Sequence, residues 1–319
     1  MMRAALLPAI LAAACSSNEV AAPPPRLLTT GGAPGLGIAV DASHVYWTAE
    51  DGVVRRVAKN GGDVETVRSG AALGYGVAVD ATNVYWTEWA SDRWVIQAQP
   101  KAGGDRTVLA SVGVLPGSVV IGDGRFVYWN ADHAVGDGGT PMFGSVHRVP
   151  AQGGAVQDLA VNQRGAQELH LGDDGFLYWA ASDANTKRSG PDVIRRVPKD
   201  GGAVTDVVRA TAVVGALAVA HGQLVWSVLD PAYTFHTCDP SACSPRTAQS
   251  DQRYGSVGIT DGDAFYWWTY EGLVRVSSNL SRAVVLGAVD AVVIAADESR
   301  LYGISFSTGA VRSYSNSPW

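Results

Sequence analysis

Short runs rich in apolar residues, separated by polar turn residues, recur along most of the chain. In the first copy these runs are Leu36–Val40, Val45–Thr48, Val53–Val57 and Val64–Arg68. They are rich in Val, Tyr, Trp and Thr, which are typical of β-strands, and they are separated by Asp, Asn and Gly, which are typical of turns. Each copy is therefore predicted to form four short antiparallel strands.

The copies are related in sequence as well as in pattern. G-I-A-V-D-A-S-H-V-Y-W-T at Gly37–Thr48 returns as G-V-A-V-D-A-T-N-V-Y-W-T at Gly76–Thr87, and looser copies follow. Repetition at roughly forty residues is typical of arrays of small β-units. Seven four-stranded units in succession predict an all-β fold, a single seven-bladed β-propeller. The copies are centred on Tyr46, Tyr85, Tyr128, Tyr178, Val225, Tyr266 and Tyr302.

The two ends of the chain are expected to meet in one blade. The last copy has no fourth strand before Trp319, whereas Pro25–Thr30 resembles fourth-strand segments such as Thr107–Ala110. If this N-terminal strand completes the last blade, the ring closes and no strand edge is left unpaired. The propeller domain is accordingly assigned to residues 26–319.

An aspartate stands five residues before the centre of six copies. Because Asp followed by Ala-Ser, Ala-Thr or Gly suits a turn in which the side chain accepts backbone hydrogen bonds, we interpret these residues as turn formers. A ring of metal-binding carboxylates is the alternative, and Ala220 in the fifth copy speaks against it. The six residues are Asp41, Asp80, Asp123, Asp173, Asp261 and Asp297.

The Tyr-Trp pair at the centre of most copies is interpreted as core. Adjacent strand residues point to opposite faces, so in a stack of blades one ring packs forward and the next packs backward. Aromatic side chains bury large apolar areas in this way. These rings are therefore expected to hold the blades together rather than to form a ligand cage.

Glycine hairpins such as Asn60-Gly61 and Asp200-Gly201 are predicted between the third and fourth strands. In the fifth copy that place is taken by C-D-P-S-A-C, with Cys238 and Cys243 at its ends. In an exported protein a disulfide across this short loop is expected. A zinc site would need two more soft ligands besides the two cysteines, and His236 alone is insufficient. No metal and no cofactor is predicted.

The first fifteen residues, M-M-R-A-A-L-L-P-A-I-L-A-A-A-C, have the features of an export signal. The apolar run is too short to span a bilayer. Small residues before Cys15 resemble the bacterial lipoprotein box, which implies lipidation of Cys15; ordinary signal cleavage after Ala12-Ala13-Ala14 is the alternative. Residues 16–25 form a polar, proline-rich tether. We expect an exported protein at the periplasm or outer surface that contacts the membrane only through a lipid.

Composition and charge narrow the class of partner. Hydrophobic residues make up 47% of the chain, which also has 37 glycines, 10 tryptophans and 11 tyrosines, as in a turn-rich globular protein. The net charge of −6 lacks the basic excess that would offset phosphate repulsion. Nucleic acid is therefore excluded as an expected partner.

At Tyr46-Trp47-Thr48, Val54–Arg56 and Asn60-Gly61 the repeat resembles the YWTD and NHL families of β-propellers. The fourth residue of the motif is Ala49 or Glu88 rather than aspartate, and there are seven copies where the YWTD family has six. The resemblance implies the propeller fold and does not transfer receptor-type ligands. The chain is most similar to exported bacterial lipoprotein propellers of undefined role.

Copies two to five carry insertions at Glu88–Trp94, 131–145, 181–192 and 227–233, all on one predicted face. Long loops on a rigid scaffold commonly carry function. The favoured interpretation is a monomeric, noncatalytic binding or scaffolding module for a protein, peptide or glycan. Its candidate ligand contacts are Tyr75, Trp89, Trp94, His133, Phe143, Glu168, His170 and Tyr233.

Two other functions are considered. Glu168 and His170, two residues apart on the first strand of copy four, could form an acid–base pair or bind a metal, as in a propeller enzyme of the lactonase or streptogramin-lyase type. A purely structural part of an assembly is the other alternative. A serine hydrolase finds no support, because the chain has no G-x-S-x-G motif.

Overall fold

The computed structural model describes residues 24–30, 32–69, 76–112, 116–133, 143–163, 165–182, 191–228, 234–249, 258–261, 264–269, 272–277, 279–280, 283–285, 293–305 and 307–315. Within these ranges the structure is entirely β, with 28 strands and no helix. The described part of the chain therefore contains no helix that is long and apolar enough to cross a membrane.

The strands form seven four-stranded antiparallel sheets, which we number as blades 1 to 7. Blade 1 consists of β2 (Gly35–Val40), β3 (His44–Ala49), β4 (Val54–Ala58) and β5 (Glu65–Arg68). Its strands match the predicted runs to within one residue at each end. Blade 2 consists of β6 (Val77–Val79), β7 (Asn83–Ala90), β8 (Arg93–Pro100) and β9 (Thr107–Val112). Blade 3 consists of β10 (Pro116–Gly122), β11 (Phe126–His133), β12 (Phe143–Pro150) and β13 (Gln157–Ala160).

The second half of the chain repeats this order. Blade 4 consists of β14 (Gln167–Leu171), β15 (Phe176–Ser182), β16 (Asp192–Pro198) and β17 (Thr205–Arg209). Blade 5 consists of β18 (Val214–Ala220), β19 (Gln223–Val228), β20 (Thr234–Cys238) and β21 (Arg246–Gln249). Blade 6 consists of β22 (Gly258–Thr260), β23 (Ala264–Thr269), β24 (Gly272–Ser277) and β25 (Ala283–Val285). Blade 7 consists of β26 (Val293–Ala296), β27 (Arg300–Ile304), β28 (Val311–Ser315) and, from the N-terminus, β1 (Arg26–Thr29).

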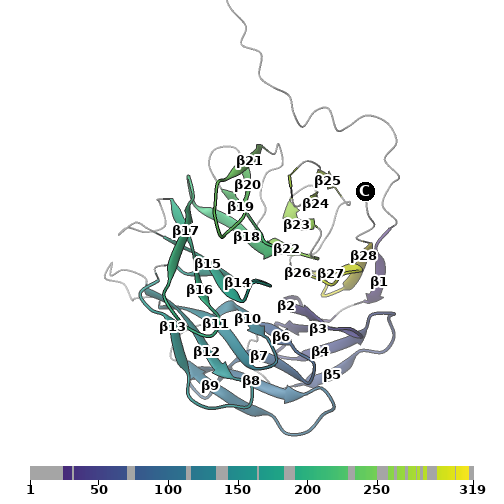
Figure 1. Cartoon of the computed structure of the whole chain (residues 1–319). Coiled ribbons are helices and arrows are strands. Elements are labelled where there is room, and N and C mark those ends of the chain that lie inside the picture. Colours follow the sequence, from purple (N-terminus) through teal and green to yellow (C-terminus); the bar gives the residue numbers. More distant parts are fainter. Residues whose placement is uncertain are drawn as a thin grey trace, which may run out of the picture.

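The blades are arranged in a closed ring around the first strand of each. These inner strands, β2, β6, β10, β14, β18, β22 and β26, contact one another in cyclic order, and β26 returns to β2. Figure 1 shows them nearest the middle, with the fourth strands toward the rim. The predicted seven-bladed β-propeller is confirmed.

The ring closes through β1, as the sequence predicted. β1 pairs antiparallel with β28, and the sheet order β1-β28-β27-β26 places it at the outer edge of blade 7. Leu28 is buried in the same core cluster as Trp47 of blade 1 and Ile304 of blade 7. Backbone hydrogen bonds therefore hold the N-terminal strand in the last blade, and an apolar cluster joins the last blade to the first.

The central Tyr-Trp pairs form the core between blades. The tyrosine of one blade lies in a cluster with the tryptophan of the next: Tyr46 with Trp86, and Tyr85 with Trp129. The same arrangement crosses the closing seam, where Tyr302 of blade 7 lies with Trp47 of blade 1. These rings are almost completely buried, so their interpretation as core is correct.

The aspartates before these pairs form turns. Asp41 accepts hydrogen bonds from the backbone N–H groups of Ser43 and His44, at 2.7 and 2.8 Å, and from the Tyr46 hydroxyl at 2.9 Å. The contact with the tyrosine is a second role that the sequence did not indicate. It recurs at Asp80, Asp123, Asp261 and Asp297.

In blade 4 the predicted residue is wrong by one position. Asp174, not Asp173, accepts the hydrogen bond from the Tyr178 hydroxyl, at 2.6 Å. The turn is wider there, because the N–H of Gly172 bonds to the carbonyl of Phe176, four residues on, where the other turns bond three residues on. Asp173 instead accepts a hydrogen bond from the backbone of His221 in blade 5.

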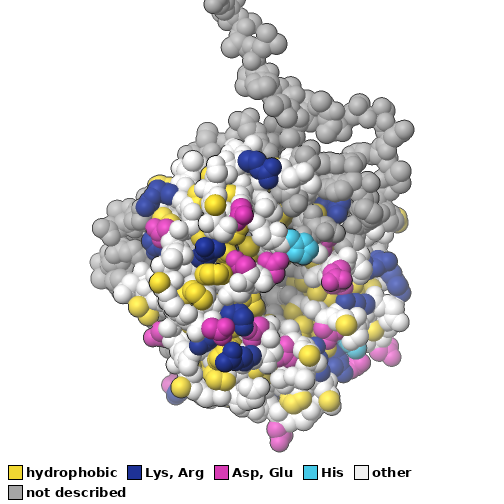
Figure 2. Space-filling model, in the orientation of Figure 1, with side chains coloured by type: hydrophobic (Ala, Val, Ile, Leu, Met, Phe, Trp, Pro, Cys, Tyr) yellow, Lys and Arg dark blue, Asp and Glu magenta, His cyan; other side chains and the backbone are white. Residues whose placement is uncertain are grey.

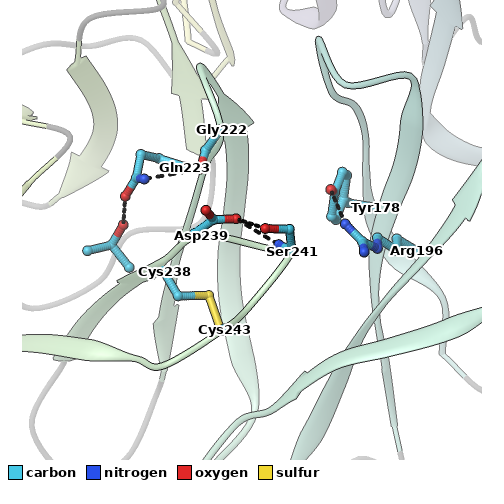
Figure 3. Close-up of a disulfide and its surroundings, with 9 residues drawn as sticks. Tyr178, Arg196, Gly222, Gln223, Cys238, Asp239, Ser241 and Cys243 are labelled. Atoms are coloured by element: carbon cyan, nitrogen blue, oxygen red, sulfur yellow. Dashed lines mark hydrogen bonds between the residues drawn. A yellow bond between two sulfur atoms is a disulfide. The ribbon is translucent and has the colours of Figure 1, made fainter.

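The fifth blade contains the predicted disulfide between Cys238 and Cys243 (Figure 3). Within the loop, Asp239 accepts hydrogen bonds from the backbone and the hydroxyl of Ser241, at 2.8 and 2.6 Å. Cys238 is buried and packs in a cluster with Trp226. The disulfide therefore occupies the hairpin between β20 and β21, where four other blades have a glycine turn.

Lysines in the hairpins between third and fourth strands connect neighbouring blades, a feature that the sequence did not indicate. Each lysine lies next to the turn aspartate of the preceding blade, so it adds an ion pair to the Tyr–Asp hydrogen bond. The pairs are Lys101–Asp41 at 2.5 Å, Lys199–Asp123 at 3.0 Å and, across the closing seam, Lys59–Asp297 at 2.5 Å.

Because of the ion pair between Lys59 and Asp297, the free energy of unfolding is expected to depend on pH. Burial would raise the pKa of Asp297, but hydrogen bonds from Lys59, Ser299 and the backbone of Arg300 outweigh it and lower the pKa to about 2. The unfolded chain, with the ordinary pKa of 3.8, binds the proton first as the pH falls. The resulting stability is complete above about pH 4 and is lost between about pH 4 and pH 2.

Asp297→Asn should therefore be less stable than the wild type by about 2 kcal/mol at pH 7. The difference should shrink as the pH falls from about 4 to about 2, because the wild type then loses the same contribution. Urea unfolding of both proteins across this pH range measures the difference. A difference that is independent of pH would contradict the assignment.

Candidate functional site

The hairpin of β7 and β8 in blade 2 is described in full, including its turn. β7 and β8 stay paired through Trp89 and Trp94 to Ala90 and Arg93, and only Ser91 and Asp92 form the turn. Both turn residues have positive φ, 48° and 80°, as a two-residue hairpin requires. The segment predicted as an inserted loop is therefore a rigid extension of two strands.

Two tryptophans cap this hairpin. The rings of Trp89 and Trp94 meet edge to face, with centroids 5.5 Å apart and planes at 71°. Trp94 is buried in a core cluster with Val112 and with Ala131 of blade 3. Trp89 lies on the outside of this pair and is 42% exposed. The buried ring thus holds the exposed ring in a fixed orientation.

The base of the hairpin contains a buried carboxylate. Glu88 is 3% exposed and accepts hydrogen bonds from the Trp86 indole at 2.8 Å, from the Gln97 amide and from Arg106 at 2.9 Å. A buried charge is tolerated when it is paired and hydrogen-bonded in this way. Glu88 directly follows Tyr85-Trp86-Thr87, and it ties β7, β8 and the loop before β9 together.

The second predicted pair lies on the inner strand β14. The register of β14 against β15 shifts between Gln167 and His170, and Glu168 has a positive φ of 55°. The regular alternation that would place Glu168 and His170 on one strand face is therefore interrupted. Because the surrounding protein desolvates the His170 ring, the pKa of His170 falls to about 4, and the imidazole is neutral at pH 7.

Of the other predicted ligand contacts, only His133 and Phe143 belong to the described residues. His133 and Phe143 form the last backbone pair of β11 and β12, so they stand at the end of that hairpin. Tyr75, Tyr233 and Cys15 lie outside the described residues. No three His, Cys, Asp or Glu side chains within the described ranges come together as metal ligands.

Two histidines stack on core tryptophans; the sequence analysis did not consider His147 and considered His236 only as a zinc ligand. His147 lies over Trp129, with ring centroids 5.3 Å apart, and His236 lies over Trp226 at 5.2 Å. Each histidine is directly opposite its tryptophan in the strand register. Their equivalence is one of strand register and not of sequence spacing, because loops of different length separate each histidine from its tryptophan.

Over the face seen in Figure 2, acidic and basic side chains are interspersed on the described surface. This mixed charge does not resemble the continuous basic surface that binds nucleic acid. The expectation drawn from net charge remains a prediction.

Comparison with known proteins gives the fold and nothing finer. No family model and no curated protein matches the chain. Among solved structures it is similar to the computationally designed Ika8 protein, with a TM-score of 0.62 and 11% identity over 91% of this chain and 99% of that one. It is also similar to Saccharomyces cerevisiae Sqt1, with a TM-score of 0.57 and 9% identity over 93% and 99% of the two chains.

A nidogen/laminin complex is matched at a TM-score of 0.43 and 18% identity, over 78% of each chain, and this likeness is too low to support an argument. The chain is a seven-bladed β-propeller. Because a propeller carries no chemistry by itself, function has to be inferred from the parts in which the blades differ.

Proposed function

We propose that the protein is an exported, lipid-anchored propeller of the cell envelope that binds or scaffolds a protein, peptide or glycan through a noncatalytic face. Binding takes place on the face from which the β7–β8 hairpin projects. The observation that carries this proposal is Trp89, an exposed aromatic ring that packs on the buried Trp94, on a hairpin whose base is fixed by Glu88.

Trp89 has the properties of a binding anchor. Exposed large hydrophobic side chains of the described surface are otherwise aliphatic: Leu27, Val64, Val108, Val156 and Val161. Tryptophan is enriched among the residues that dominate binding energy, because it offers a large contact area with little loss of conformational entropy. A ring already held in place loses still less on binding.

Export and anchoring rest on the sequence. The signal-like residues 1–15 and the tether 16–25 precede β1, the outermost strand of blade 7. A lipid on Cys15 would thus reach the propeller at its rim and leave the hairpin face of blade 2 open to a partner. The YWTD-like repeats support the same class of exported bacterial lipoprotein propellers.

Trp89→Ala should weaken binding at least about 10-fold, as expected for an aromatic hot spot. The full-length protein would be screened against a glycan array and a displayed peptide library, and each binder would be titrated by calorimetry. Val161→Ala removes an exposed apolar side chain from blade 3 and serves as the matched control, with unchanged affinity. Binders that are equally insensitive to both changes would contradict the proposal.

A propeller enzyme of the lactonase or lyase type is the second candidate. Burial keeps the His170 imidazole neutral, which is the form that accepts a proton or binds a metal. The register shift in β14 interrupts the alternation that would pair His170 with Glu168, so this candidate rests on the neutral His170 imidazole as the base. Loss of lactone hydrolysis in His170→Gln, with an unchanged melting temperature, would support this candidate.

A further inference from the structure

A Ser-His-Asp relay lies on the outer half of blade 3. Ser145 Oγ is 2.6 Å from Nε2 of His147, and Nδ1 of the same ring is 2.8 Å from Oδ1 of Asp158. Ser145 and His147 are two residues apart on β12, and Asp158 faces His147 from β13. A register shift between Val146 and His147 brings this carboxylate opposite the ring.

The carboxylate determines the direction of the relay. An ionised carboxylate only accepts hydrogen bonds, so Nδ1 of His147 carries the proton and donates to Asp158. In the neutral imidazole Nε2 is then the acceptor, and the Ser145 hydroxyl donates to it. This is the arrangement in which a histidine can take the proton of a nucleophilic serine while a carboxylate holds the ring in the required tautomer.

The relay is held rigidly at the interface of blades 2 and 3. His147 stacks on Trp129 at 28°, and Trp129 belongs to the cluster that joins the two blades. Ala131, directly opposite Ser145, lies in the same cluster as Trp94. Ser145 is 4% exposed, so only a small electrophile can reach its hydroxyl.

Blade 5 contains the same framework without the carboxylate. Nε2 of His236 is 3.0 Å from the Thr234 hydroxyl, but Nδ1 lies 2.9 Å from the Thr247 hydroxyl. A hydroxyl can donate or accept, so it does not fix the tautomer of His236. His236 of blade 5 can therefore be compared with His147 of blade 3. Both rings stack on a tryptophan, but His236 contacts two hydroxyl groups where His147 contacts a hydroxyl and a carboxylate.

We propose that Ser145 is an acyl-accepting nucleophile, with His147 as its general base and Asp158 as the positioning residue, and that it reacts with small activated esters. Oγ forms a bond to the acyl carbon, its proton passes to Nε2, and the alcohol leaves with that proton as its bond to carbon breaks. Water then attacks the acyl-serine with His147 again as base, so that the carboxylic acid and free serine are released.

The test uses a small dialkyl fluorophosphate on the purified full chain, because a phosphorylated serine hydrolyses slowly and remains in place for mass measurement. Intact mass should show one adduct, and peptide mapping should place it on Ser145. Ser145→Ala should give no adduct at this peptide. His147→Gln should slow the labelling about 10²- to 10⁴-fold, the usual contribution of a general base.

Asp158→Asn gives the readout that separates positioning from folding. Asp158 is largely exposed, with 61% of its side chain accessible, so its replacement by an isosteric amide should leave the melting temperature nearly unchanged. Labelling should slow, and the midpoint of its pH profile should move to lower pH, because the carboxylate that stabilises the imidazolium is gone. A purely structural contact would leave that midpoint in place.

Thr234→Ala is the matched control and should leave the rate of Ser145 labelling unchanged. Two results would overturn the proposal: folded wild type that acquires no adduct on Ser145 at pH 8, or labelling that proceeds at the same rate in folded His147→Gln. Hydrolysis of p-nitrophenyl acetate that is lost in Ser145→Ala would support turnover beyond the first acylation.

Discussion

Replacing Trp47 with alanine is expected to lower the free energy of unfolding by about 3 to 5 kcal/mol. Trp47 is 1% exposed and lies at the seam, in one cluster with Leu28 of β1, Tyr302 and Ile304 of blade 7. Its removal leaves a cavity that rigid sheets on both sides cannot fill. Because this cluster joins the first blade to the last, the loss affects closure of the whole ring.

Urea and thermal unfolding measure this effect, and the melting temperature should fall by roughly 10 °C for a domain of this size. Trp89→Ala, which removes the same side chain from an exposed position, should cost well under about 1 kcal/mol. Equal midpoints for Trp47→Ala and the wild type would refute the assignment of the ring to the core.

The fold was predictable because it is periodic. The Tyr46-Trp47 centre and the turn at Asp41 each recur in several copies. The prediction of the propeller rests mainly on the agreement among these copies. Ring closure was predictable for a related reason, since one missing strand at the C-terminus matched one extra strand at Pro25–Thr30.

Contacts between blades were not predictable in the same way. Lys59 and Asp297 are far apart in sequence, and nothing local marks the lysine as a partner for a turn carboxylate. In blade 4 the residue that bonds to the tyrosine is Asp174 and not the predicted Asp173. The turn there is one residue wider, which moves the carboxylate without changing the order of residue types along the sequence. Such details depend on backbone geometry, which a count of residue spacing does not contain.

The candidate sites were predicted least well. Trp89 and Trp94 were singled out as loop aromatics, but their different roles follow from burial, which decides that one ring supports the other. The Ser145 relay was missed because a sequence motif for serine hydrolases describes one local backbone. The same three side chains can meet through a register shift between two strands.

Deleting β1 should have a larger effect than any single substitution. A chain that starts at Gly32 lacks Arg26–Thr29, so the edge of β28 loses its partner strand and Leu28 no longer fills the seam. The unpaired N–H and C=O groups of β28 would then be free to pair with another chain. We expect a broad melt well below that of the full chain, together with dimers or larger species.

Light scattering after gel filtration measures this assembly, and a chain that starts at Pro24 and retains β1 is the control, expected to remain monomeric with the wild-type melt. A synthetic peptide covering residues 24–30 should restore the monomer by adding the missing strand to β28, as peptides do at open sheet edges. Restoration should fail with a Leu28→Asp peptide, which keeps the backbone pairing but places a charge in the cluster of Trp47 and Ile304. A shortened chain that is monomeric and as stable as the control would show that the seam closes without β1, and that the backbone pairing across it contributes little to the ring.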